Sequence, residues 1–244
     1  MKVFIILVLL AFFTGMLNAQ PSYSVSGGVK LINSEPHEMT LWYIDESPSH
    51  DNIYTTFSPI GNISVNLGIR WQDNLSEKAF RLFVEGQGYV GSVSGLALIA
   101  GYSYCPLVSG KVKFQPELSA VLGYCSKGIG AIDNNDVYIQ VNQTKFQDYT
   151  NVYVSLRNAY IGIKPGVSLT FDIGNEKAIG LGVNYQLSYK AGFVNFRGTG
   201  EDGNPATDSE SLTARNVGFY VDGTRTSDNP YNPDGLEFKL FYCF

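Results

Sequence analysis

Strict alternation of apolar and polar residues is the dominant pattern along most of this chain. Between Asn62 and Gln72, the odd positions are Ile, Val, Leu, Ile and Trp, whereas the even positions are Asn, Ser, Asn, Gly, Arg and Gln. A period of two residues places the two sets on opposite faces of a β-strand. No sustained helical spacing follows residue 20, so the sequence predicts an all-β chain.

The same alternation recurs in eight segments, with large aromatic residues on the apolar face and Arg, Lys or Glu on the other. A soluble sandwich can contain such strands, but it is not expected to repeat them throughout with few charges elsewhere. Apolar-out and polar-in alternation is typical of a transmembrane β-barrel. The segments are Tyr23 to Leu31, 62–72, 80–87, 96–105, 112–124, 159–171, 179–190 and 236–244.

The connections between these segments also alternate in character. Residues 73–78, 107–111 and 172–177 are short and turn-like, and residues 91–95 form a further short connection. Long polar connections occupy residues 33–60, 126–150 and 197–234. The sequence therefore predicts an eight-stranded antiparallel up-and-down transmembrane β-barrel with short periplasmic turns and long extracellular loops. Ten strands are the alternative, if Asn216 to Val221 or Val137 to Val141 also cross.

One segment changes its parity. Before Asn158 the apolar residues are Val152, Val154 and Leu156, and after it they continue from Ala159 at odd positions. This change predicts either a β-bulge or a strand that extends past the membrane, with the irregularity at residues 157–159.

Composition and targeting agree with an exported membrane barrel. The 244 residues are 44% hydrophobic but only 16% charged, which argues against disorder and coiled coil. With 17 Lys and Arg against 22 Asp and Glu, and no basic run, no nucleic-acid partner is expected. Residues 1–19 have the pattern of a signal peptide cleaved after Ala19, which leaves a barrel domain over residues 20–244.

Nine charged residues fall on the polar face of the predicted strands. An eight-stranded barrel is only wide enough for its own side chains, and an isolated buried charge is costly. We therefore expect the opposite charges to pair across the interior, although six basic against three acidic groups leave a narrow anion-preferring path as the alternative. The predicted interior network consists of Arg70, Arg81, Glu85, Lys113, Glu117, Lys164, Lys190, Glu237 and Lys239.

The last segment ends in Phe244 with an aromatic residue two positions earlier. Apolar residues continue at alternate positions before it, so that the set is Leu236, Phe238, Leu240, Tyr242 and Phe244. On this ending and the whole strand pattern, the chain resembles the small outer-membrane barrels of Gram-negative bacteria, the OmpA/OmpX-like family broadly, and most of all the porin-family barrels of Bacteroidetes. The resemblance implies a location in the cell outer membrane, contact with its lipid and lipopolysaccharide, and recognition of the C-terminus by the barrel-assembly machinery.

No motif in the sequence carries enzymatic chemistry. Two G-x-G-x-x-G matches, at residues 86–91 and 198–203, do not lie between a strand and a helix as dinucleotide binding requires. His37 and His50 share the first long loop with acidic residues, but their spacing matches no known metal site. We expect no catalytic residue, no cofactor and no metal, and the cysteines at 105 and 125 lie too far apart in a hairpin for a disulfide.

Function is therefore expected to reside in the loops rather than in a reaction centre. The favoured hypothesis is a non-enzymatic surface, structural or interaction barrel whose loops 33–60, 126–150 and 197–234 contact extracellular or secretion-system proteins. The alternative is a small-solute porin or channel. A barrel subunit of a secretion system, an outer-membrane enzyme and a secreted soluble β-sandwich are weaker hypotheses.

Overall fold

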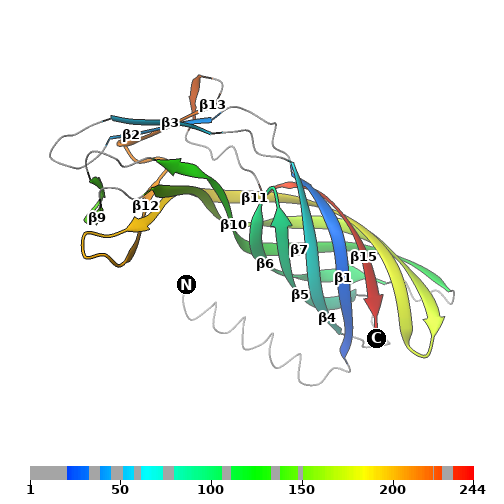
Figure 1. Ribbon diagram of the computed structural model, residues 1–244. Coiled ribbons are helices and arrows are strands. Elements are labelled where there is room, and N and C mark those ends of the chain that lie inside the picture. Colours follow the sequence, from blue (N-terminus) through cyan, green and yellow to red (C-terminus); the bar gives the residue numbers. More distant parts are fainter. Residues whose placement is uncertain are drawn as a thin grey trace, which may run out of the picture.

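The computed structural model describes residues 21–32, 39–44, 52–57, 62–73, 80–105, 111–132, 138–147, 151–221, 223–226 and 233–244. Eight of its strands form a closed antiparallel ring (Figure 1). In chain order they are β1 (Pro21–Ile32), β4 (Ile63–Asp73), β5 (Phe80–Gly91), β6 (Ser94–Tyr104), β7 (Val112–Ile132), β10 (Val152–Gly174), β11 (Lys177–Thr199) and β15 (Gly235–Cys243). Each predicted segment corresponds to one of them, so the eight-stranded up-and-down fold is confirmed.

The ring closes because the first and last strands pair with each other. β1 pairs with β15 from Ser24 opposite Cys243 to Ile32 opposite Gly235. The backbone amide of Phe244 also donates to the carbonyl of Tyr23 at 2.9 Å. Closure leaves no unpaired backbone edge in the ring, which a β-sheet surrounded by hydrocarbon requires.

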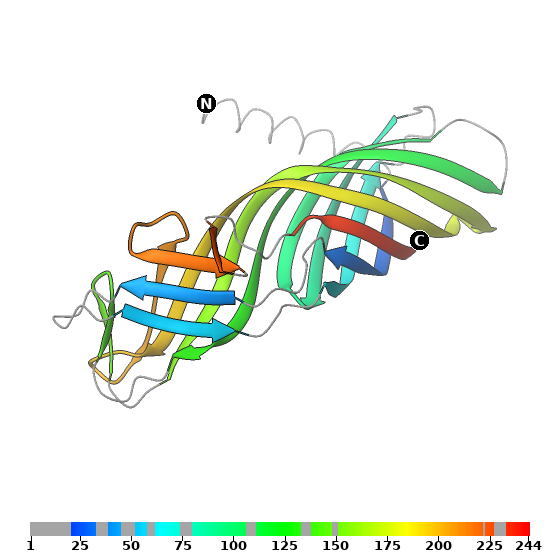
Figure 2. The same ribbon diagram turned by 90° about the horizontal axis from the view of Figure 1, so that it is seen from above.

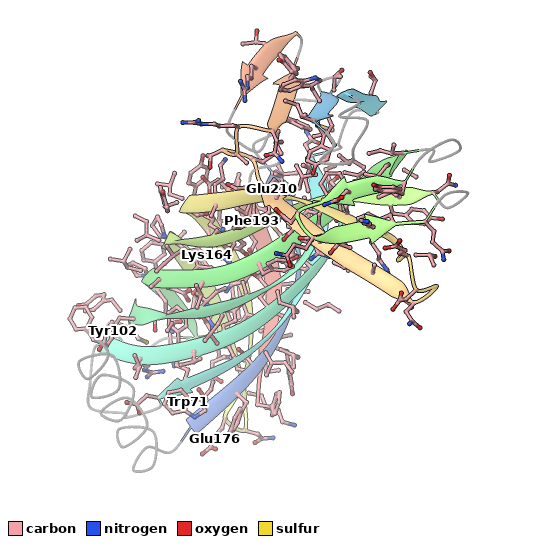
Figure 3. The ribbon with its side chains drawn as sticks, turned by 90° about the vertical axis from the view of Figure 1, so that its left-hand side faces the viewer. Trp71, Tyr102, Lys164, Glu176, Phe193 and Glu210 are labelled. Atoms are coloured by element: carbon pink, nitrogen blue, oxygen red, sulfur yellow. The ribbon has the colours of Figure 1, made fainter. Side chains whose placement is uncertain are left out.

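The outer face of the ring is apolar and exposed, as the alternation predicts. Leu67 and Leu96 are 70% and 71% exposed, although a soluble chain would bury such side chains. Aromatic residues gather at the short-turn end, where the rings of Phe80 and Tyr104 lie 5.0 Å apart between centroids. Trp71 and Glu176 mark this end of the barrel in Figure 3. The ring therefore has an outward apolar belt with aromatic residues at one rim.

Three ring strands continue well beyond the barrel. β7 has 21 residues, and β10 and β11 have 23 each. β12 (Pro205–Ser211) pairs with the far end of β11. A second sheet has the order β14 (Thr224–Thr226), β13 (Val217–Val221), β2 (Met39–Ile44) and β3 (Asn52–Phe57), and β8 (Ile139–Val141) pairs with β9 (Thr144–Phe146). We call these seven strands and the far ends of β7, β10 and β11 the extension (Figure 2).

The extension has an apolar core of the kind found in soluble domains. Phe196 of β11 lies against Tyr43 of β2, with 5.1 Å between ring centroids, and both side chains are buried. Val154 of β10, Phe146 of β9 and Phe219 of β13 belong to the same cluster. The four-stranded sheet thus covers the inward face of the long ring strands, where they leave the barrel.

This extension corrects the prediction of long polar loops. The connections 33–60, 126–150 and 197–234 contain strands that build a second folded region rather than loops alone. The ten-strand alternative is also wrong. β13 joins the second sheet and β8 pairs with β9, so among the described residues neither 216–221 nor 138–141 enters the ring.

The parity change at Asn158 has a different cause from a bulge at that position. The strand β10 alternates without a break there, since Leu156, Asn158 and Tyr160 are all buried. Its pairing with β7 shifts instead between Val154 and Ser155. The apolar residues change face because the inward side is polar in the barrel and apolar in the extension. The predicted irregularity at 157–159 is therefore wrong, and the strand that extends beyond the barrel is correct.

Some sequence predictions lie outside the described residues. These include the signal peptide over residues 1–19 and both histidines, His37 and His50. Within the described ranges, no helix is long and apolar enough to cross a membrane.

Candidate functional site

The barrel lumen holds most of the charged residues that the sequence placed inside. Alternate residues of β5 point into the lumen, so their sequence along the strand gives the order of the lumen contacts from one end of the barrel to the other. Glu85, Gln87 and Tyr89 occupy three successive inward positions, and all three are buried. Each of them contacts charged or polar side chains from other strands. We call these three groups of contacts the levels of the lumen, and they follow one another from the short-turn end toward the extension.

The first level, at Glu85, is a four-residue ion-pair cluster. Arg70 Nη1 and Nη2 donate to the two carboxylate oxygens of Glu117 at 2.8 and 3.0 Å. Arg70 Nε donates to Glu85 Oε2 at 2.9 Å, and Lys239 Nζ reaches the same oxygen at 3.2 Å. The guanidinium also lies 4.0 Å from the ring centroid of Phe83. Bidentate pairing of this kind fixes both charges and orientation.

The second level, at Gln87, is centred on a lysine. Lys164 Nζ donates to Glu237 Oε2 at 2.7 Å and to Gln87 Oε1 at 3.3 Å. The side chains of Lys164 and Glu237 are only 3% and 1% exposed. Ser119 Oγ donates to the backbone carbonyl of Lys164 at 3.0 Å and adds a polar contact to this position.

The third level, at Tyr89, has a basic residue that the sequence analysis missed. Lys30 Nζ donates to Gln186 Oε1 at 2.7 Å and lies 5.6 Å from the ring centroid of Tyr89. The hydroxyls of Tyr89 and Tyr160 lie 2.9 Å apart. Alternation alone could have found Lys30, because it lies between the outward residues Val29 and Leu31.

A polar cavity opens at the short-turn end of the lumen. It measures about 230 Å³, and Arg81 and Lys113 line it beside Asp172, Glu176 and Lys177. Arg81 and Lys113 are half-buried, as is Lys190 at the opposite end. Among the described residues, none of these three takes part in an ion pair within 4.0 Å. The structure therefore brings six of the nine predicted network residues into ion pairs and leaves three near the ends of the lumen.

The cavity does not continue as an open path through the three levels. Arg70 is the most exposed of their charged residues, at 9%, and the others are more deeply buried. The buried apolar cluster of the extension, which includes Cys125 and Leu156, continues into the lumen, where Tyr89, Ile99 and Val121 belong to it. Side chains thus fill the interior from the ion-pair cluster into the extension.

Titratable groups outside the lumen have local structural contacts. Asp202 accepts hydrogen bonds from the backbone and side chain of Asn204, which lower the pKa of this fully exposed carboxyl group. Asp208 accepts a hydrogen bond from Asn142 at 3.0 Å. Within the described part of the chain, no three His, Cys, Asp or Glu side chains form a group that could hold a metal ion.

No disulfide forms among the cysteines of the described residues. Cys105, Cys125 and Cys243 each keep a thiol group. Cys125 pairs in register with Gly95 at the start of β6, whereas Cys105 follows the other end of that strand. The prediction that these two cysteines lie too far apart to form a disulfide is confirmed.

The C-terminal residues of the predicted assembly signal lie on the outer face of β15. Phe238, Leu240 and Phe244 are exposed, and Leu236 and Tyr242 are half-buried. The ring of Phe244 stacks between those of Tyr242 and Tyr23, with centroid separations of 6.2 and 6.4 Å. Recognition of this segment by assembly machinery stays a prediction.

Comparison with solved structures finds a similar outer membrane protein. No family model and no curated protein matches the sequence. The crystal structure of a major outer membrane protein from Thermus thermophilus matches over 92% of this chain and 100% of that chain, with a TM-score of 0.48 and 13% sequence identity.

Proposed function

We propose that this chain is an integral outer-membrane β-barrel with a filled lumen, a non-enzymatic protein whose extension is a surface for interaction. The observation that carries the proposal is the inverted arrangement of the ring, which is apolar outside and charged inside. Only a surrounding hydrocarbon phase makes this arrangement favourable, because a closed barrel satisfies its backbone and exposes apolar side chains. We further propose that it is one of the small OmpA/OmpX-like barrels of Gram-negative bacteria, a proposal supported by its eight ring strands and its C-terminal ending.

The two ends of the barrel differ in a way that gives it an orientation. Outer-membrane barrels have short periplasmic turns and longer extracellular segments. The tight turn at Asn175 and Glu176 lies between β10 and β11 at one end, and the extension lies at the other. We therefore assign the short-turn end to the periplasm and the extension to the cell surface. After export, the barrel-assembly machinery would insert the chain through its C-terminal strand.

Filling of the lumen favours a structural or interaction role over transport. A channel needs a continuous water path, whereas the ion pairs of Arg70 and Lys164 cross the interior at two levels. The extension offers a folded surface on which loops can contact extracellular or secretion-system proteins. This surface has an apolar core of its own, which includes Tyr43, Phe196 and Phe219.

Single-channel conductance in a planar bilayer tests the proposal. Protein folded in detergent, with folding verified by its heat-dependent gel mobility, should insert and remain silent. An open porin measured in the same bilayer is the control for detection. Steady openings from the wild-type protein, with ion preference shifted toward cations by Lys164→Glu, would overturn the filled-lumen assignment and establish the porin alternative. Failure to associate with bilayers at all would overturn the membrane assignment.

A further inference from the structure

A polar groove lies on the outer face of the extension, away from the lumen. It has a volume of about 850 Å³ and lies over the far ends of β7, β10 and β11. Two arginines, Arg157 and Arg197, contribute the charge. The remaining polar lining comes from Ser126, Tyr153, Ser155, Asn195 and Thr199.

Strand register explains why these residues share one face. Tyr153 lies opposite Arg197, and Ser155 lies opposite Asn195, in the pairing of β10 with β11. Ser126 lies opposite Arg157 in the pairing of β10 with β7. Residues opposite each other in antiparallel strands project from the same side of the sheet. The groove is therefore built into the sheet and does not depend on a loop.

Asn195 is the deepest polar group of the groove and lacks a full set of hydrogen bonds. Its side chain is 2% exposed, and its Oδ1 atom has no hydrogen-bond partner among the described residues. The buried Nε of Arg157 also has no partner there. Buried polar atoms are normally paired, and the residues that carry this acceptor and this donor both line the groove, which indicates a polar ligand.

The charge of the groove selects an anion. No acidic side chain occurs among its described lining residues. The nearest acids of β12, Asp208 and Glu210, pair in register with the core residues Phe196 and Val194 and thus lie on the opposite face of the sheet. Two guanidinium groups without a competing carboxylate are suited to phosphate or carboxylate oxygens.

The position of the groove relative to the apolar belt indicates where the anion comes from. On the outer face of β10, the exposed residue Ile161 is followed toward the extension by Ala159 and then Arg157. Four residues of strand place Arg157 roughly 13 Å beyond Ile161. Tyr189, opposite Ile161, is 82% exposed and lies at the upper part of the belt. Phe193, opposite Arg157, marks this junction in Figure 3.

We propose that this groove binds the phosphorylated sugar headgroup of an outer-leaflet glycolipid, of the lipopolysaccharide type. The inference rests on the proposed membrane location, because the groove faces outward at the height where headgroups follow the acyl chains. Its arginines would pair with phosphates, and Ser126, Ser155 and Asn195 would hydrogen-bond sugar hydroxyls. Gly128 lines the groove with no atom within 4 Å of where a Cβ would lie, which leaves space for a sugar ring.

Binding of purified lipopolysaccharide to the detergent-folded protein tests the proposal. The Arg157→Gln/Arg197→Gln double variant should lose affinity by about tenfold or more for each charge-assisted contact removed. Arg215→Gln, an arginine of the extension outside the groove, is the matched control and should bind as the wild type does. Gly128→Phe should also lose binding, because it fills the groove without changing its charge.

Three ligands distinguish the source of the anion. Lipopolysaccharide should bind, its dephosphorylated form should bind at least about tenfold more weakly, and glucosamine 1-phosphate alone should compete poorly because it lacks the membrane anchor. Equal binding of the phosphorylated and dephosphorylated lipids, or full binding by the double variant, would overturn the proposal. Strong binding of the soluble sugar phosphate would assign the groove to a free ligand instead. Heat-dependent mobility of every variant reports separately whether the barrel itself has formed.

Discussion

At the scale of single residues, Arg70 determines how three strands meet in the lumen. It comes from β4 and binds Glu85 of β5 and Glu117 of β7 at the same time. A buried ion pair adds little net stability compared with an apolar pair, but loss of one partner leaves an uncompensated charge. Removal of one member of the cluster should therefore destabilise the barrel by more than formation of the whole cluster stabilises it.

Arg70→Met should destabilise the barrel strongly. The change leaves Glu85 paired with Lys239 and Glu117 without an ion pair among the described residues, and loss of one partner from a buried pair costs about 3–5 kcal/mol. Urea unfolding in detergent, followed by heat-dependent gel mobility, measures the loss. Arg81→Met is the matched control, because Arg81 lies on the same side of the lumen without an ion pair among the described residues. Equal destabilisation by the two changes would contradict the assigned role of the cluster.

The sequence predicts which residues face inward but not which of them meet. Alternation places Arg70, Glu85 and Glu117 on the polar face. Arg70 and Glu85 lie opposite each other on the neighbouring strands β4 and β5, whereas the contact of Arg70 with Glu117 of β7 crosses the lumen between strands that do not pair. Asn195 shows more clearly that the local sequence does not reveal the contacts of a residue. Its neighbours Val194 and Phe196 are buried core residues, and only the pairing with Ser155 reveals that it lines a groove on the other face.

At the scale of secondary-structure elements, β10 passes through two environments without a break. In the barrel its inward residues are polar, as Lys164 and Ser168 are, and in the extension they are apolar, as Val152 and Val154 are. Because β10 continues without a break, its apolar residues occupy odd positions in the barrel and even positions in the extension. The pattern contains this information, but the same pattern also results from a bulge, so only the pairing decides.

The extension was predicted less well than the barrel because its strands are short. β2 has six residues, and its burial alternates from Met39 to Ile44 in a connection with acidic and proline residues. Period-two patterns become specific only when they continue over several residues. The partners of β2 are β3 and β13, of which β13 follows more than 170 residues later. Its pairing is therefore not visible in the local sequence.

Phe219→Ala should unfold the extension and leave the barrel intact. Phe219 of β13 is fully buried in the apolar cluster, and removal of a buried phenylalanine side chain costs about 3–5 kcal/mol. Because the lumen has its own polar contacts, heat-dependent mobility should persist while brief proteolysis cuts the second sheet. Tyr220→Ala, a half-buried neighbour, is the control and should remain resistant. A variant that loses both properties together would show that barrel and extension unfold as one unit.

At the scale of the whole molecule, the chain contains two folded regions with opposite hydrophobic arrangements. The barrel exposes apolar residues and buries charges, whereas the extension buries apolar residues and exposes polar ones. Each arrangement is stable only in its own surroundings, lipid for the first and water for the second. With the proposed membrane location, the boundary between them along β7, β10 and β11 would fix the depth of the molecule in the bilayer.

The two tryptophans report on these two regions separately. Trp71 belongs to the outer, odd-numbered set of β4 near the short-turn end, and Trp42 lies in β2 of the extension. In vesicles of lipids brominated near the headgroup, fluorescence of Trp71 should be quenched because bromine reaches the apolar belt. Trp71→Phe leaves Trp42 as the remaining tryptophan, and its emission should be insensitive to bromine. Quenching of Trp42 to the same extent would place the extension in the bilayer, and no quenching of either residue would mean that the ring does not meet lipid at all.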